Sequence, residues 1–295
     1  MNLLLERLLN ETVILTDGAW GTELQARGLA AGQFPETWNL SHPELVTDVA
    51  RSYVDAGSQI ILTNTFGANR VRLEETSLAG DVAQINRLGV QISQQAATGR
   101  ALVFASMGPS GKLLLAQEIK PEELRAAFEE QAAALADARP DAIVIETMAD
   151  LCEAKAAVAA AKSTGLPVVA CMVFDSGKNK DRTMMGVTPG NAARALTDSG
   201  ADIIGANCGN GIANFLSIAQ QLREGTHLPL WLKPNAGLPE WADGQPVYKA
   251  DPKDFAERAF ELGRTGAKFI GGCCGTSPAF IRAIRQRLPG APEQR

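Results

Sequence analysis

Histidine, tyrosine and long apolar runs are scarce in this chain, and their scarcity excludes several classes of protein. Only 2 histidines and 2 tyrosines occur among 295 residues, and all aromatic residues together make up 5%. The net charge is −5 and the basic residues are scattered, so the sequence lacks the basic, aromatic-rich surface of a nucleic-acid-binding protein. The leucine-rich start from Met1 to Asn10 carries Glu6 and Arg7 and is too short for a signal peptide. No stretch is apolar for long enough to span a membrane, so we expect neither a nucleic-acid partner nor a membrane partner.

Cysteine is also sparse, and its number is odd. Five cysteines cannot form a complete set of disulfides, which favours a reducing compartment and a cytoplasmic protein. The composition, 45% hydrophobic and 21% charged, suits one globular domain over residues 1–295, because α/β barrels reach this length without dividing. We find no linker and no low-complexity stretch, and we expect the tail from Pro289 to Arg295 to fray.

Eight short apolar segments alternate with helical patterns along the chain. The predicted strands cover residues 12–16, 58–63, 101–106, 142–145, 167–174, 201–205, 228–233 and 268–270. They are continuously apolar rather than alternating, which indicates a parallel sheet whose faces are covered by helices. Eight such units predict a single closed (β/α)8 TIM barrel, with the active site at the C-terminal ends of the strands. A doubly wound sheet is the alternative, but no glycine-rich dinucleotide fingerprint follows the first strand.

Three of the cysteines come after predicted strands. Cys208 follows the strand at 201–205, and Cys273 and Cys274 lie in the glycine-rich turn at 271–276. Glycine lets the backbone adopt positive φ and approach a ligand closely, so this turn can aim both thiols at one point. Adjacent cysteines are poor partners for a disulfide, because the bridge would close a strained ring. Free cysteines are commonly small buried hydrophobes, but three at one rim of a barrel indicate a shared metal site.

The donor set favours zinc. Soft thiolates select zinc, and three protein ligands without a fourth leave the open position of a catalytic site. The two histidines are poor alternative ligands, since His42 starts a helix and His227 precedes a strand near the opposite rim. Cys152 lies inside a predicted helix and Cys171 inside a predicted strand, and we expect both to be core residues.

A zinc ion held by three thiolates has a narrow chemistry. Three negative ligands over-neutralise Zn²⁺ and make it a weak Lewis acid for activating water. The ion can still bind a substrate thiol as its thiolate at neutral pH, where a free thiol with a pKa of ~8.5 is mostly protonated. A fourth thiolate gives the group excess negative charge and leaves the sulfur nucleophilic. The ligand types therefore predict alkylation of a thiol, most simply by methyl transfer.

Polar residues at the same rim suggest which thiol is bound. Asp17 and Glu146 follow the first and fourth strands and can hold a substrate ammonium, while the backbone around Gly18 can donate hydrogen bonds to a carboxylate. An Asx-turn is the alternative role for Asp17, whereas a glutamate directly after an apolar strand is harder to explain structurally. Asn64 and Asn235 follow the second and seventh strands and are further candidates for substrate binding. Together these residues predict a site for an amino-acid thiol.

The motifs around these residues resemble those of the zinc-dependent homocysteine S-methyltransferases. The pairing of Asn207-Cys208-Gly209 with Gly271-Gly272-Cys273-Cys274-Gly275-Thr276 carries the resemblance, which extends from the Asp17-Gly18 turn over nearly the whole chain. Thr63-Asn64-Thr65-Phe66 and Pro234-Asn235-Ala236-Gly237 resemble most the homocysteine module of cobalamin-dependent methionine synthase. The family also includes the betaine–homocysteine and the S-methylmethionine-using methyltransferases.

The resemblance implies a transferase of methionine biosynthesis that methylates homocysteine to methionine. The implied zinc ligands are Cys208, Cys273 and Cys274. The homocysteine sulfur is then the fourth ligand, and the residues matching Asp17 and Glu146 contact its amine. The backbone of the turn at Gly18 meets its carboxylate, and Asn235 occupies the empty zinc position when no substrate is bound.

Departures from the family pattern bear on the methyl donor. Betaine enzymes are expected to cage the quaternary ammonium with aromatic faces, and two tyrosines of that cage are absent, since Gly67 follows Phe66 and Thr147 follows Glu146. Betaine is therefore less favoured. Three other aromatic residues can build a different cage, namely Trp20, Phe34 and Trp38. We find no folate or cobalamin module, so the expected donor is a small sulfonium such as S-methylmethionine, or methylcobalamin on a separate corrinoid protein.

Two alternatives remain open. Lys233 closes the seventh strand, and a lysine there can form a Schiff base with a carbonyl substrate, as in aldolase-type barrels. That function would leave the three rim cysteines unexplained. The other alternative is a non-autonomous methyltransferase subunit that docks a corrinoid protein and is inactive alone.

Overall fold

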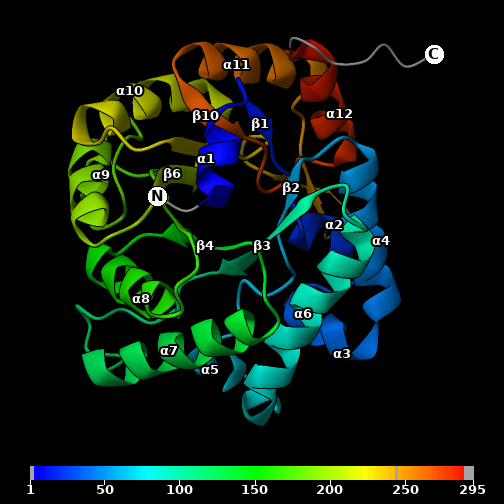
Figure 1. Cartoon of the computed structure of the whole chain (residues 1–295), viewed down its shortest axis with the longest axis vertical. Coiled ribbons are helices and arrows are strands. Elements are labelled where there is room, and N and C mark those ends of the chain that lie inside the picture. The colour runs from blue at the N-terminus through cyan, green and yellow to red at the C-terminus, as the bar shows by residue number, and fades with distance from the viewer. Residues whose placement is uncertain (1–2, 243–244, 289–295) are drawn as a thin grey trace.

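Eight parallel strands form the centre of the molecule, and helices surround them (Figure 1). A computed structural model describes residues 3–242 and 245–288. The strands are β1 (Ile14–Leu15), β2 (Ile60–Ile61), β3 (Leu102–Met107), β4 (Ala142–Met148), β5 (Val168–Met172), β6 (Ile203–Cys208), β7 (Leu230–Pro234) and β10 (Ala267–Ile270). Their order in the sheet is β1-β10-β7-β6-β5-β4-β3-β2, and a parallel bridge between Thr16 and Ile60 joins the two ends. The ring therefore closes, and the predicted (β/α)8 barrel is confirmed.

The helices lie outside this ring, and some of them begin at a side chain that caps the first turn. They are α2 (Gly21–Ala26), α3 (Trp38–Ser41), α4 (Pro43–Asp55), α5 (Arg70–Leu73), α6 (Val82–Ala97), α7 (Pro121–Asp137), α8 (Leu151–Ser163), α9 (Pro189–Asp198), α10 (Phe215–Gly225), α11 (Pro252–Arg264) and α12 (Pro278–Arg287). Asp150 and Asp251 accept hydrogen bonds from the first backbone N–H groups of α8 and α11. Proline occupies the first turn of α4, α7, α9, α11 and α12, where its missing N–H costs nothing. None of the helices in the described ranges is long and apolar enough to cross a membrane.

A short N-terminal helix, α1 (Leu3–Leu9), covers one end of the barrel and was not anticipated from the sequence. Figure 1 shows it across the middle of the ring. Leu5 and Leu8 are buried there against Ile14, Trp231 and Phe269. The Trp231 and Phe269 rings have centroids 5.3 Å apart. This end of the barrel is therefore filled by apolar side chains and leaves the opposite, C-terminal end for the site.

The strands differ from their predicted bounds at both ends, and β1 and β2, predicted at 12–16 and 58–63, are each only two residues long. β4 and β6 run further than expected, so that Glu146 lies within β4 and Cys208 is the last residue of β6. An antiparallel hairpin of β8 (Glu240–Ala242) and β9 (Gln245–Val247), which was not predicted, follows β7. The predicted tail at 289–295 lies outside the described residues.

Candidate active site

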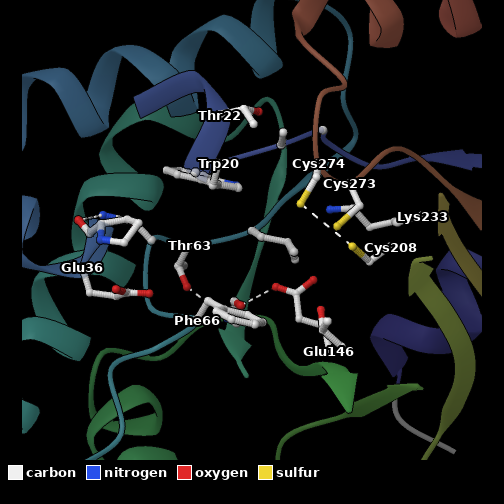
Figure 2. A pocket seen from close by; sticks show the side chains of 18 of the residues that line it. Trp20, Thr22, Glu36, Thr63, Phe66, Glu146, Cys208, Lys233, Cys273 and Cys274 are labelled. Atoms are coloured by element: carbon white, nitrogen blue, oxygen red, sulfur yellow. Dashed lines mark hydrogen bonds between the residues drawn. The ribbon is translucent and has the colours of Figure 1, made fainter. Parts of the chain in front are cut away.

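Three thiols meet at the C-terminal end of the barrel (Figure 2). Cys208 ends β6, and Cys273 and Cys274 follow β10. Their Sγ atoms all lie within 4.8 Å of one another, and the Cys208 and Cys274 sulfurs are 3.9 Å apart. Across residues 3–242 and 245–288, no other group of three or more His, Cys, Asp or Glu side chains is close enough to share a metal ion. The structure thus brings together the three predicted zinc ligands.

The three thiols can all ionise only beside a cation. Hydrogen bonding among the thiols raises the pKa of Cys208 and lowers the pKa of Cys274, so the free group does not readily carry three negative charges at once. Three thiols this close can all become thiolates only if a cation neutralises them. A site of three soft sulfur donors, with room for a fourth ligand on the cavity side, fits zinc.

The turn that carries two of the thiols can be built only from glycine at its start. A Cβ on Gly271 would lie 2.0 Å from Thr16 Oγ1, and one on Gly272 would lie 2.2 Å from Thr276 Oγ1. The backbone of the turn is therefore pressed against the end of β1. Cys273 is further fixed by a 2.8 Å hydrogen bond from its backbone N–H to the carbonyl of Pro234.

Asn207, which the sequence marks only as part of the Asn-Cys-Gly motif, ties the thiol group to β4. Its Nδ2 donates to Cys273 Sγ at 3.7 Å and to Thr147 Oγ1 at 2.6 Å, and its Oδ1 accepts from the Thr147 backbone N–H at 2.7 Å. Thr147 and Cys208 both have positive φ, 61° and 63°, which is strained for residues with a side chain. Asn207 is thus bonded to one strained residue and adjacent to the other. Its position beside Cys208 in the Asn-Cys-Gly motif was the signal that could have found it.

Asn235 has one unused side-chain atom and is bonded to the backbone of Cys208 and Gly209. Its Nδ2 donates to the carbonyls of Gly209 and Gly237 at 2.6 and 2.9 Å, which fixes the orientation of the amide. Its Oδ1 is buried without a hydrogen-bond partner among the described residues. An orphaned acceptor beside Cys208, whose carbonyl accepts from the Asn235 N–H at 3.3 Å, fits the predicted role as a placeholder ligand. That role stays a prediction.

Asp17 is fully buried, and its carboxylate is occupied by groups of the chain itself. Oδ2 accepts from Trp20 Nε1 at 2.8 Å and from the Leu62 backbone N–H at 2.7 Å, and Oδ1 is ion-paired with Lys233 Nζ. Burial lowers the pKa of Lys233, but the charges of Asp17 and Glu146 outweigh it and hold that pKa above its usual value. Asp17 therefore anchors Trp20 and the ammonium of Lys233, and the predicted contact of Asp17 with a substrate amine stays untested.

The carboxylate of Glu146 is more available to a ligand than that of Asp17. It is 8% exposed and faces the cavity between Phe66 and the cysteines (Figure 2). Ser106 Oγ donates to its Oε1 at 2.5 Å. Burial, partly offset by Lys233, raises the pKa of Glu146 to about 7. A carboxylate that is costly to ionise in the free protein gains most from a cationic partner, which suits a substrate ammonium.

A cavity of about 430 Å³ joins these groups. It is lined at one end by the cysteines, Glu146 and Lys233, and it continues past three aromatic rings. Those aromatic residues are Trp20, Phe34 and Phe66. Gly18 and Asn64 also line the cavity, as expected, although the Asn64 amide donates to the carbonyl of Pro35 at 2.8 Å and so holds the loop before α3.

The remaining cysteines and the histidines lie elsewhere. Cys171 is buried within β5, as expected. The expectation that Cys152 is a core residue is wrong, because it is the second residue of α8 and faces solvent. His42 and His227 are both exposed and take no part in the thiol group.

A family model for homocysteine S-methyltransferase matches residues 14–288. The chain belongs to this family. It is 31% identical over 296 residues to methionine synthase of Mycobacterium tuberculosis, an alignment that covers 94% of this chain and 25% of that protein. It is 32% identical to betaine–homocysteine S-methyltransferase 1 of Bos taurus, covering 99% of this chain and 75% of the relative. The chain thus spans about a quarter of the length of the methionine synthases it matches.

A solved structure agrees with this fold. The metallated form of the Escherichia coli homocysteine methyltransferase MmuM superposes with a TM-score of 0.81 at 24% identity, over 97% of this chain and 100% of that chain. The recognised family and the barrel therefore agree with what the cysteine motifs implied.

Proposed function

We propose that this protein transfers a methyl group to the thiol of homocysteine in a zinc-dependent reaction, giving methionine. The observation that carries the proposal is the convergence of three thiols on the same cavity as a buried, available glutamate. An amino-acid thiol that accepts a methyl group needs both features: the thiols hold the metal that activates its sulfur, and the glutamate binds its amine. Membership of the family supports homocysteine as that thiol.

Cys208, Cys273 and Cys274 would hold the zinc. Bound there, zinc would keep a substrate thiol in its thiolate form at neutral pH, and the thiol proton would leave to solvent. Asn207 donates to Cys273 Sγ and so fixes one donor atom. The unpartnered Oδ1 of Asn235 supports its role as the group that the substrate sulfur displaces.

Three groups of the chain would orient homocysteine. Glu146 would accept hydrogen bonds from the ammonium, and the backbone around Gly18 would donate to the carboxylate. Asp17 would act through Trp20 and Lys233, since its oxygens already accept from both. In the chemical step a bond forms between the homocysteine sulfur and the methyl carbon, and the bond from that carbon to the donor breaks with its electron pair staying on the donor.

The size of the cavity favours a small donor bound beside homocysteine, such as S-methylmethionine. This is the donor in the name of a rat relative that is 30% identical over 99% of this chain, S-methylmethionine–homocysteine S-methyltransferase. A methylated corrinoid protein is the second candidate, because the methionine synthases match this chain over one part of a longer protein. Betaine is disfavoured by the missing tyrosines.

The Schiff-base alternative is disfavoured by the environment of Lys233. A lysine that attacks a carbonyl must be neutral, whereas Lys233 is ion-paired with Asp17 and its pKa lies above the usual range. An ammonium that balances the charges of Asp17 and Glu146 is poorly suited to act as a nucleophile.

The function is tested by measuring methionine formation by zinc-loaded protein with homocysteine and, separately, S-methylmethionine, betaine or methylcobalamin. Turnover with the sulfonium would identify a self-sufficient enzyme. Turnover with methylcobalamin alone would identify a subunit of a two-protein methyl relay. No methionine with any of these donors would contradict the proposal.

A further inference from the structure

The cavity has a second polar end, remote from the cysteines, where Glu36 lies (Figure 2). Glu36 is 2% exposed, and its Oε1 accepts a 2.5 Å hydrogen bond from the backbone N–H of Gly67. Its Oε2 is buried and has no hydrogen-bond partner among the described residues. A buried carboxylate oxygen without a donor costs free energy, so this end of the cavity is incomplete without a cationic or N–H-bearing ligand.

Arg72 on α5 is the second incomplete group at this end. Its guanidinium lies over the Phe34 ring, 5.2 Å from the centroid, and its Nε is buried without a hydrogen-bond acceptor in the described part of the chain. The Asn69 side chain accepts from the Arg72 backbone N–H at 3.0 Å and fixes the start of the helix. The guanidinium is therefore held in place by stacking and by its helix, with a donor left unused.

These two opposite charges share one wall of the cavity without bonding each other. A Cβ on Gly67 would lie 3.0 Å from Glu36 Oε1 and 3.3 Å from Arg72 Nε, so both side chains flank the same point of the loop after β2. No ion pair joins Glu36 to Arg72 among the described residues, although such a pair would satisfy both. A ligand that carries an ammonium and a carboxylate on neighbouring atoms would satisfy both at once.

Aromatic rings lie between this polar end and the thiols. Trp20 and Phe66 line the cavity on opposite sides (Figure 2), and Asp17 pins Trp20 by accepting from its indole N–H. Phe66 is confined as well, because its ring lies 2.5 Å from where a Cβ on Gly108 would be. Fixed aromatic faces attract an onium centre and exclude water from it.

We propose that Glu36 and Arg72 form a donor subsite that selects an α-amino-acid sulfonium, a deduction that rests on the proposed methyl transfer to homocysteine. The donor's ammonium binds Glu36 and its carboxylate binds Arg72. Its sulfonium lies between the aromatic rings with one methyl group toward the cysteines. When the methyl carbon bonds to the homocysteine sulfur, the sulfonium–methyl bond breaks and its electron pair stays on sulfur, which leaves a neutral thioether amino acid.

The subsite is tested with three donors that differ by one group. S-Methylmethionine carries both charges at its remote end, 4-(dimethylsulfonio)butanoate lacks the ammonium, and 3-(dimethylsulfonio)propylamine lacks the carboxylate. We expect the wild-type protein to prefer S-methylmethionine over each analogue by about tenfold to a hundredfold in kcat/KM, the size expected for one charge-assisted hydrogen bond. Equal use of the three donors would overturn the subsite.

Two variants assign the selectivity to the two residues. Glu36→Gln keeps an oxygen for the Gly67 N–H and should abolish the preference over the analogue without the ammonium, while the preference over the other analogue remains. Arg72→Met should give the opposite pattern. Damage to the fold alone would lower turnover of all donors together, and that result in both variants would contradict the proposal. Arg70→Met, on the same helix but 44% exposed and paired with Glu130, is the matched control and should change neither preference.

Homocysteine binding, measured by calorimetry on the same zinc-loaded proteins, distinguishes a failure of the donor subsite from a failure of the proposed methyl transfer. Both variants should bind homocysteine as the wild type does. If homocysteine binds and methionine forms from methylcobalamin but from no sulfonium, methyl transfer stands and the donor subsite is wrong. If homocysteine does not bind and no donor is used, the proposed function itself is wrong.

Discussion

The two ends of the barrel are built from the same strands but do different work. The end under α1 is filled by apolar side chains, among them Leu8, Trp231 and Phe269. The C-terminal end holds ionisable groups, unpartnered polar atoms and two residues with strained positive φ. The apolar end stabilises the fold. The strained residues and unpartnered polar atoms of the C-terminal end lower the stability of the fold, and they form the binding site.

Along a strand, a residue of the apolar end and a residue of the site can be only two positions apart. On β7, Trp231 belongs to the apolar cluster and Lys233 to the site, and on β4 the same step leads from Val144 to Glu146. Residues two apart on a strand point to the same side, here into the barrel. Stability and function should therefore be separable by mutations at adjacent layers of the interior.

The largest loss of activity is expected from mutation of the rim cysteines. Cys208→Ser or Cys274→Ser should abolish both zinc binding and methionine formation, because the group has no spare thiolate. Zinc per chain, measured by mass spectrometry of the metal, and turnover check this. Cys152→Ser, at an exposed cysteine outside the group, is the control and should keep both. Full zinc content in Cys208→Ser would contradict the assigned ligands.

Glu146→Gln should weaken homocysteine binding and yet stabilise the metal-free protein at high pH. The pKa of Glu146 is about 7 in the folded protein against an ordinary value of 4.5. Between these pH values the folded protein keeps a proton that the unfolded protein has lost. The wild type therefore loses stability relative to the variant as pH rises from 4.5 through about 7. We expect the variant to be more stable than the wild type at pH 8 by up to about 3 kcal/mol, at 1.36 kcal/mol per pKa unit. The gain should vanish below pH 4.5.

Urea unfolding at a series of pH values measures this difference, and calorimetry measures the homocysteine affinity. Equal stability of both proteins at pH 8 would show that the carboxylate carries no ionisation cost in the free site. Unchanged affinity would remove Glu146 as the ammonium-binding group.

Leu8→Ala should affect the other end alone. Removing a buried side chain from the apolar end should lower the free energy of unfolding by about 2–3 kcal/mol. The homocysteine affinity of the folded protein should stay at the wild-type value, since Leu8 belongs to the opposite end of the barrel from the thiols. A matching loss of affinity would show that the two ends are coupled.

No covalent adduct on Lys233 is expected when the protein is treated with borohydride and a carbonyl substrate. Lys233 is buried and ion-paired with Asp17, so it should form no reduced adduct. Mass spectrometry of the peptide that contains Lys233 provides the check. An adduct there would revive the aldolase-type alternative.

The sequence allowed the barrel and its three rim cysteines to be predicted because both depend on local patterns. Apolar segments at regular spacing define the strands, and glycines next to cysteines mark the turns. The contacts between strands could not be predicted. Asn207 on β6 reaches past β5 to Thr147 on β4, and Ser106 on β3 reaches Glu146 on the adjacent β4. Both contacts depend on the register between strands.

Other features that were missed depend on long-range contacts or on which face of an element a residue occupies. The anchoring of Asp17 by Lys233 joins residues 216 positions apart, and the sequence shows only an aspartate in a turn and a lysine at a strand end. Helix α1 is a short leucine-rich run whose burial depends on the open end of the barrel that it covers. The position of Cys152 depends on which face of α8 it occupies, and an alanine-rich helix gives little indication of that face.

The most direct test of the central claim replaces zinc by cobalt(II) in the same site and follows the sulfur-to-metal charge-transfer absorption when homocysteine is added. We expect the band to intensify to the level of four sulfur ligands with wild-type protein and with Cys152→Ser. An analogue with a methylated thiol should leave the spectrum unchanged. A cobalt spectrum that is indifferent to homocysteine, in a protein that binds cobalt through its three rim cysteines, would contradict the claim that this centre activates the thiol to be methylated.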